Sequence, residues 1–181
     1  MPLTKSEQFR RVTLLCCHFV RNLAYHLADK ISPVEFERAG EFWITVHSNF
    51  IDCCVLEWCK LFVDTKNRNP GEHRWDNVVA DKARFEAELF QHIDQTQFQT
   101  LVDAMRTARN KFIAHLDDQN NEDTSAMDVA QEAVQFYHNY IVMNEAQPGD
   151  NLHPRTVTGL LTDLNDYYSA CYREARKIYA P

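Results

Sequence analysis

The chain has 181 residues, of which 45% are hydrophobic, 25% charged and 12% aromatic, a composition typical of one globular domain. Nineteen Lys and Arg against 26 Asp and Glu give a formal net charge of -7, which excludes a global positive field that would attract nucleic acid. Four glycines and six prolines are too few turn-forming residues for a many-stranded barrel or sandwich. We therefore expect a single helical domain over residues 1–181, in which any contact with RNA is local.

The N-terminal segment and the cysteines indicate a cytoplasmic protein without a membrane segment. The first residues are charged and lack a continuous apolar core, and charged side chains interrupt the most apolar stretch, residues 50–63. The six cysteines include the adjacent pairs Cys16–Cys17 and Cys53–Cys54, and no C-x-x-C motif occurs. Adjacent cysteines suit neither a shared metal nor a relaxed disulfide, so we expect reduced core thiols, no metal and no other cofactor.

Hydrophobic residues recur with a helical period in six segments, which predicts an all-α fold, an up-and-down bundle of about six helices. Ser32 and Thr156 are the predicted N-caps of the second and sixth helices. The second helix is apolar nearly all round and is expected to be the most buried one. The predicted helices cover residues 6–28, 32–63, 81–93, 96–116, 125–146 and 156–178.

One segment, R-N-K-F-I-A-H-L-D at residues 109–117, combines residue types that phosphodiester cleavage uses. An arginine can bind a phosphate through two hydrogen bonds, and a histidine of ordinary pKa exchanges protons near neutral pH. An arginine followed by four to six residues and a histidine occurs four times in the chain, so the spacing alone is weak evidence. Arg109 differs from the other three arginines because, on a helical projection, it lies near the centre of an apolar stripe with Phe98, Met105 and Leu116.

A guanidinium on an apolar stripe requires an ion pair, a cleft or an interface. Glu57 lies on the apolar side of the second predicted helix and is the expected partner of Arg109, in a pair that could also be purely structural. Arg109 and His115 lie roughly 120° apart around an ideal helix and about 9 Å apart along it. Either the helix bends or ends before His115, or a homodimer cleft combines residues from two chains.

The segment 109–117 resembles the motif of the HEPN superfamily (higher eukaryotes and prokaryotes nucleotide-binding), in which an arginine and a polar residue precede a histidine. It is most similar to the abortive-infection toxin branch, where this string follows a buried helix that ends in a run like W-C-K-L-F at residues 58–62. The resemblance implies a HEPN-like helical fold and a dimeric, metal-independent endoribonuclease. It also implies that Arg109 and His115 are catalytic and that Asn110 is their polar neighbour.

The resemblance further implies attack of a ribose 2′-hydroxyl on the adjacent phosphorus, with His115 as general base or acid and Arg109 stabilising the phosphoryl charge. DNA lacks this hydroxyl and is expected to resist cleavage. Arg106 and Lys111 are candidates for RNA phosphate contacts, and Asp117 for orienting His115, although ordinary solvated positions would explain all three. In a sister toxin branch a tyrosine at the position of Asp117 accepts nucleotides from a nucleotidyltransferase antitoxin, so we do not expect that control here.

Two functions from different classes remain open. The first is a HEPN-type ribonuclease that cleaves RNA as a homodimer, acts as a toxin or phage-defence effector, and has an antitoxin or defence-system protein as a further partner. The second is a non-catalytic HEPN-like helical module that binds a protein, nucleotide or RNA. The acidic net charge favours the second, and the R-N-K and A-H-x-D context favours the first.

Overall fold

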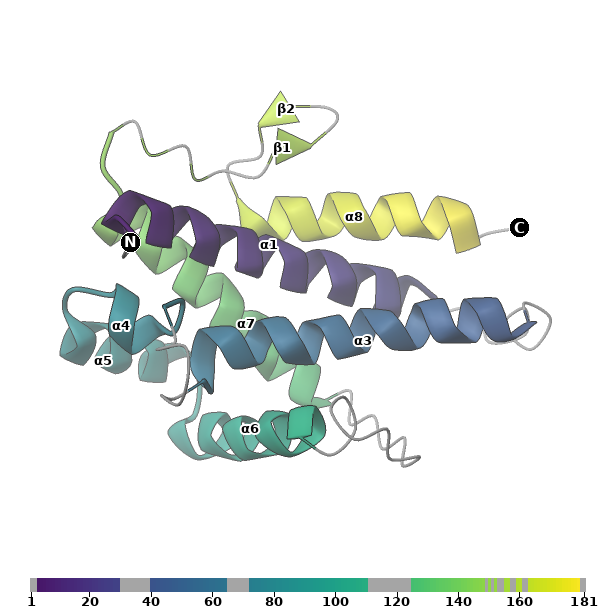
Figure 1. The fold of residues 1–181 in the computed structure, drawn as a ribbon, viewed down its shortest axis with the longest axis horizontal. Coiled ribbons are helices and arrows are strands. Elements are labelled where there is room, and N and C mark those ends of the chain that lie inside the picture. The colour runs from purple at the N-terminus through teal and green to yellow at the C-terminus, as the bar shows by residue number, and fades with distance from the viewer. Residues whose placement is uncertain are drawn as a thin grey trace.

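The computed structural model describes residues 3–29, 40–64, 72–110, 125–148, 150, 152, 155–156, 159–160 and 163–179, and it shows an all-α bundle. Helix α1 lies between α8 and α3 and contacts both, while α7 crosses behind them and α6 lies on the other side of α3 (Figure 1). The elements are α1 (Lys5–Asp29), α3 (Gly40–Phe62), α4 (Trp75–Val78), α5 (Lys82–His92), α6 (Gln95–Ala108), α7 (Ser125–Tyr140), the π-helical turn η2 (Ile141–Glu145), the strands β1 (Arg155–Thr156) and β2 (Gly159–Leu160), and α8 (Leu164–Tyr179).

Helix α1 is the central helix of the bundle. It buries apolar residues toward several neighbours, because α8, α3 and α7 all pack against it. At its C-terminal end, Nη1 of Arg176 in α8 donates to the Ala28 carbonyl at 3.2 Å, which helps to satisfy a helix end that lacks intrahelical partners. The buried apolar residues of α1 are Phe9, Val12, Cys16, Cys17, Phe19, Val20, Leu23, Ala24 and Ala28.

The prediction that the second helix is the most buried one is wrong, since α1 buries more of its residues than α3 does. The C-terminal half of α3 is buried around Trp58, but Phe42 and Ile44 near its N-terminus are 69% and 52% exposed. Figure 1 shows the reason, because the first turns of α3 extend past the ends of α6 and α7. An apolar sequence shows that a helix can be buried on every side, but the neighbouring helices determine which part of it is buried.

Helices α4, α5 and α7 meet around the buried ring of Phe85. Its centroid lies 4.9 Å from those of Trp75 and Tyr140, 5.1 Å from Phe136 and 5.4 Å from Tyr137. Offset and edge-on contacts at these distances add to the free energy gained by burying the rings. The aromatic cluster therefore joins the short helix α4, which the periodicity did not predict, to the rest of the bundle.

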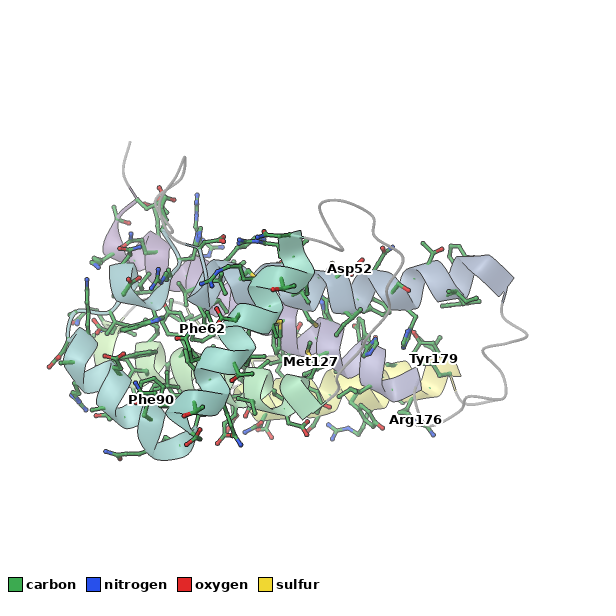
Figure 2. The ribbon with its side chains drawn as sticks, turned by 90° about the horizontal axis from the view of Figure 1, so that it is seen from below. Asp52, Phe62, Phe90, Met127, Arg176 and Tyr179 are labelled. Carbon is green, nitrogen blue, oxygen red and sulfur yellow. The ribbon has the colours of Figure 1, made fainter. Side chains whose placement is uncertain are left out.

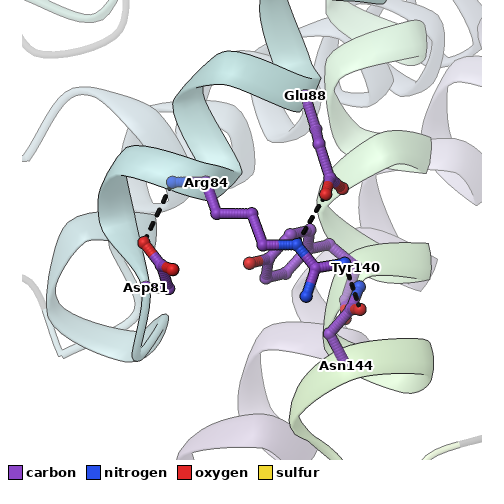
Figure 3. A network of polar contacts seen from close by, with 5 residues as sticks. All are labelled: Asp81, Arg84, Glu88, Tyr140 and Asn144. Atoms are coloured by element: carbon purple, nitrogen blue, oxygen red, sulfur yellow. Dashed lines mark hydrogen bonds and ion pairs between the residues drawn. The ribbon is translucent and has the colours of Figure 1, made fainter.

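A polar network above Tyr140 holds α5 against α7 and η2 (Figure 3). Nε of Arg84 donates to Glu88 at 2.6 Å, its Nη2 donates to Oδ1 of Asn144 at 3.1 Å, and its guanidinium carbon lies 6.0 Å from the centroid of the Tyr140 ring. Asp81 caps α5 by accepting a hydrogen bond from the backbone N–H of Arg84 at 3.0 Å. This cap explains why the helix begins where the sequence predicts.

The sixth predicted helix begins later than expected. Thr156 is not an N-cap, because it pairs with Gly159 in the short antiparallel ladder of β1 and β2. Helix α8 begins at Leu164, directly after Asp163, whose Oδ1 accepts a hydrogen bond from the backbone N–H of Asn165 at 2.7 Å. Asp163 thus supplies the cap that the sequence analysis placed at Thr156. Ser32, the other predicted cap, lies outside the described residues.

The prediction that the cysteines are core thiols is confirmed for five of the six, which are buried, whereas Cys53 is only partly buried. Burial raises the pKa of the Cys16 and Cys54 thiols well above the usual value, and that of Cys17 and Cys59 to about 12. These thiols therefore stay protonated and pack as small apolar groups. In the described part of the chain, no helix combines the length and apolarity that crossing a membrane requires.

We predict that Phe85→Ala lowers the free energy of unfolding by about 3–5 kcal/mol, because it leaves a cavity between four aromatic rings. Urea denaturation followed by circular dichroism measures this change. Met143→Ala is the control, since Met143 is exposed and its truncation should change stability by less than about 0.5 kcal/mol. A change below about 1 kcal/mol for Phe85→Ala would contradict its central place in the cluster.

Candidate functional site

Arg109 lies at the C-terminal end of α6, where the helix changes geometry. Its backbone N–H still bonds to the Met105 carbonyl, but α6 ends at Ala108 and the next two residues, Arg109 and Asn110, are π-helical. Changes of this kind occur often at functional sites. The change of geometry begins before His115, as one of the two alternatives expects, but His115 itself lies outside the described residues, so both alternatives stay open.

The partner of Arg109 is Asp64, the second residue after the end of α3. Nη1 of Arg109 donates to Oδ1 of Asp64, and its Nε donates to Oδ1 of Asn110 at 3.2 Å. The structure thus brings Arg109, Asn110 and Asp64 together. Asn110 is the next residue in the chain, and its role as the polar neighbour of a catalytic arginine stays a prediction.

The predicted pairing of Arg109 with Glu57 is wrong. Glu57 faces α1, where its carboxylate lies 3.9 Å from Nδ1 of His18, and it also pairs with Lys60 of its own helix at 3.4 Å. The helical projection placed Glu57 on an inward side of α3, but that side meets α1 and not α6. Partial burial and the nearby Arg21 lower the pKa of His18 below its usual value, although Glu57 opposes this shift.

A buried contact between α3 and α6 explains why Asp64 meets Arg109. Sγ of Cys59 donates to the Met105 carbonyl at 3.5 Å. The backbone N–H of Asp64 bonds to the Cys59 carbonyl at 2.9 Å, and that of Arg109 bonds to the Met105 carbonyl. Asp64 therefore lies about one helical turn after Cys59, and Arg109 one turn after Met105, and these two earlier residues are in contact.

The ion pair of Arg109 and Asp64 is only partly buried. The Arg109 side chain is 27% exposed and the Asp64 side chain 38%. A guanidinium has five N–H donors, and the contacts with Asp64 and Asn110 use Nη1 and Nε. As far as the described residues go, Arg109 is held in place by these two contacts and has further N–H groups that could donate to an anion such as a phosphate.

The structure describes only some of the remaining predicted site residues. Arg106, one turn before Arg109, is exposed and pairs with Asp103 of the same helix at 2.7 Å. Lys111, His115 and Asp117 lie outside the described residues, so their relation to Arg109 stays a prediction. In the ranges that the structure does describe, no three His, Cys, Asp or Glu side chains form a group that could hold a metal ion.

Sequence reasoning did not identify Asp64, which lies directly after the second predicted helix, residues 32–63, and outside every motif considered. A usable signal was present, since Asp64 is the first carboxylate after a long apolar helix. A charged residue in that position can reach the end of whichever helix packs alongside. Identifying that helix as α6 required the tertiary structure.

Comparison of the chain with protein-family models, with curated proteins and with solved structures finds no match in any of the three.

We predict a coupling free energy of about 0.2–1 kcal/mol for Asp64 and Arg109 in a double-mutant cycle of the two alanine variants, because both side chains are partly solvated. Urea denaturation of the wild type, both single variants and the double variant gives the coupling, which should fall in high salt. A matched cycle for the exposed pair Asp103 and Arg106 should give a similar value. A coupling of about 3 kcal/mol or more would show a structural ion pair.

Proposed function

We propose that the protein is a metal-independent endoribonuclease of HEPN type, with Arg109 and His115 as its catalytic residues. The observation that supports this best is the state of Arg109, which is partly exposed at the end of α6 and is oriented by Asp64 and Asn110. A guanidinium held in this way suits binding of a phosphate, whereas an arginine that served only the core would be buried. The R-N-K and A-H-x-D context supplies the second residue, His115.

In this proposal Arg109 stabilises the charge that develops on the phosphoryl oxygens when the ribose 2′-hydroxyl attacks the phosphorus. His115 accepts the hydroxyl proton or donates one to the departing 5′ oxygen. The reaction leaves a 2′,3′-cyclic phosphate and a 5′-hydroxyl and requires no metal ion. Arg106 lies one turn before Arg109 and could add a phosphate contact, because its ion pair with Asp103 is exposed.

The resemblance to the abortive-infection branch also suggests a cellular role and partners for the protein. It suggests a cytoplasmic toxin or phage-defence effector that works as a homodimer and has an antitoxin or defence-system protein as a partner. The proposed homodimer depends on the resemblance and on the roughly 120° offset between Arg109 and His115 on an ideal helix. His115 lies outside the described residues, so this offset stays an expectation.

A second candidate function is a non-catalytic HEPN-like module that binds a protein, nucleotide or RNA. Two observations favour it, namely the net charge of -7 and the carboxylate of Asp64 on Arg109. A carboxylate in contact with the guanidinium competes with a phosphate for the same donors. The activity of the purified protein decides between the two candidates.

We predict that the wild type cleaves labelled single-stranded RNA in excess EDTA and that His115→Ala reduces the rate by about 10²–10⁴-fold. Arg109→Ala should also reduce the rate strongly, because it removes the charge that stabilises the transition state. His92→Ala and Arg173→Ala are matched controls at exposed positions of α5 and α8, and they should cleave like the wild type. Gel analysis and phosphatase treatment identify the cyclic-phosphate ends.

Equal cleavage by wild type and His115→Ala would show a contaminating nuclease or a different site. Absence of cleavage from all five proteins, on RNAs of several sequences, would favour the binding module. Both results contradict the assignment of His115 as a catalytic residue.

We predict that the protein sediments as a dimer at micromolar concentration, as the resemblance implies. Analytical ultracentrifugation over a hundredfold range of concentration measures the association. The variant Arg109→Ala should dimerise like the wild type if Arg109 serves catalysis. A monomer throughout that range would contradict the proposed homodimer.

A further inference from the structure

A pocket of about 510 Å³ lies where α4, α5 and α6 meet the C-terminal end of α3. This volume is typical of pockets that hold small molecules. Figure 2 shows Phe62 and Phe90 together at the end of the molecule away from Arg176 and Tyr179. The residues that matter for its chemistry are the aromatic side chains of Phe62, Trp75, Phe90 and Phe98 and the guanidinium groups of Arg74 and Arg106.

The aromatic side chains that line the pocket pack against one another and against Phe85. The ring of Trp75 stacks on Phe85 with an interplanar angle of 12° and a centroid distance of 4.9 Å. The ring of Phe98 contacts Phe62 at 5.6 Å and Phe90 at 5.8 Å, both edge-on. Phe62 and Phe98 are almost completely buried, so the partly exposed rings of Trp75 and Phe90 offer the aromatic surface on which a planar ligand can pack.

Charged side chains line part of the pocket. Among the described lining residues are the guanidinium groups of Arg74 and Arg106 and the carboxylate of Glu86, and each arginine is also paired with an aspartate that does not line the pocket, Asp76 or Asp103. Nε of Arg74 lies 3.2 Å from Oδ1 of Asp76, and neither of these two buried atoms makes a hydrogen bond within the described part of the chain. Arg106 engages Asp103 through Nη1. The buried Nε of Arg74 cannot reach a ligand, so an anionic group would bind the terminal nitrogens of Arg74 and the remaining donors of Arg106, and arginine suits phosphate through paired hydrogen bonds.

We propose that this pocket binds a phosphorylated nucleoside, with the base against Trp75 and Phe90 and the phosphate at Arg74 and Arg106. The side-chain amides of Gln95 and Gln99 also line the pocket, and each can both donate to and accept from the edge of a base. The same chemistry is offered by a free nucleotide and by one nucleotide of a single-stranded RNA. The proposal does not depend on cleavage of RNA, because none of these residues performs proton transfer in the proposed reaction.

The test is a titration of ¹⁵N-labelled protein with each of the four nucleoside 5′-monophosphates, followed through the indole N–H signals of its three tryptophans. The Trp75 signal, identified by its loss in Trp75→Phe, should shift and saturate. The Trp43 signal should stay in place, because Trp43 lies in α3 near Tyr179, at the other end of the bundle. The matching nucleosides without phosphate should bind about tenfold more weakly, since they lack the charged group.

Arg106→Gln and Arg74→Gln should each weaken binding of the monophosphate by about tenfold and leave binding of the nucleoside unchanged. Arg106 is exposed, so its variant should fold even if Arg74→Gln does not. Arg173→Gln, on the far helix α8, is the matched control and should bind like the wild type. If a six-nucleotide single-stranded RNA saturates the protein at a lower concentration than any monophosphate does, the pocket is a subsite for RNA. If a monophosphate saturates it at the lower concentration, the ligand is a free nucleotide.

Either order of affinity supports the proposed binding of a nucleotide in the pocket. The proposal fails if neither a monophosphate nor the RNA shifts the Trp75 signal. It also fails if monophosphate and nucleoside bind equally and Arg106→Gln binds like the wild type.

Discussion

The packing of α3 against α6 is the constraint on which the candidate site depends. Cys59 and Met105 meet in the core through a thiol-to-carbonyl contact of 3.5 Å, and the rings of Trp58 and Phe98 lie 5.9 Å apart on the same interface. The backbone of Asp64 and that of Arg109 each bond to one residue of that contact. Core packing therefore fixes the distance between two charged groups that are themselves partly in solvent.

The position of Arg109 meets two competing demands. The C-terminal end of α6 carries the negative end of the helix dipole, which favours a cation there, and Asp64 adds a second attraction. Complete burial would strengthen these attractions but would also exclude an external anion and raise the cost of desolvation. Partial exposure keeps the guanidinium ordered and leaves it accessible, which is the state that a phosphate-binding arginine requires.

Helical periodicity predicted the class of fold and most helices, because those patterns are local. It failed at α8, where Leu160 continues the helical spacing but lies in a strand that is set by pairing with Arg155. It also failed for Arg109, because helical projection gives the side of each helix but not the neighbour on that side. Asp64 became visible only when α3 and α6 were placed together, and residues such as His115 still depend on the motif alone.

Arg74, Arg106 and Arg109 gather near the C-terminal ends of α3 and α6 in a chain whose net charge is -7. The acidic remainder opposes long-range attraction of nucleic acid, so these arginines cannot act as a broad electrostatic surface. They can act at short range, where an aromatic pocket and an oriented guanidinium supply contacts that solvent screens less. Recognition at this end of the bundle would then depend on the fit of a nucleotide and not on its charge alone, which favours a narrow range of ligands over general affinity for RNA.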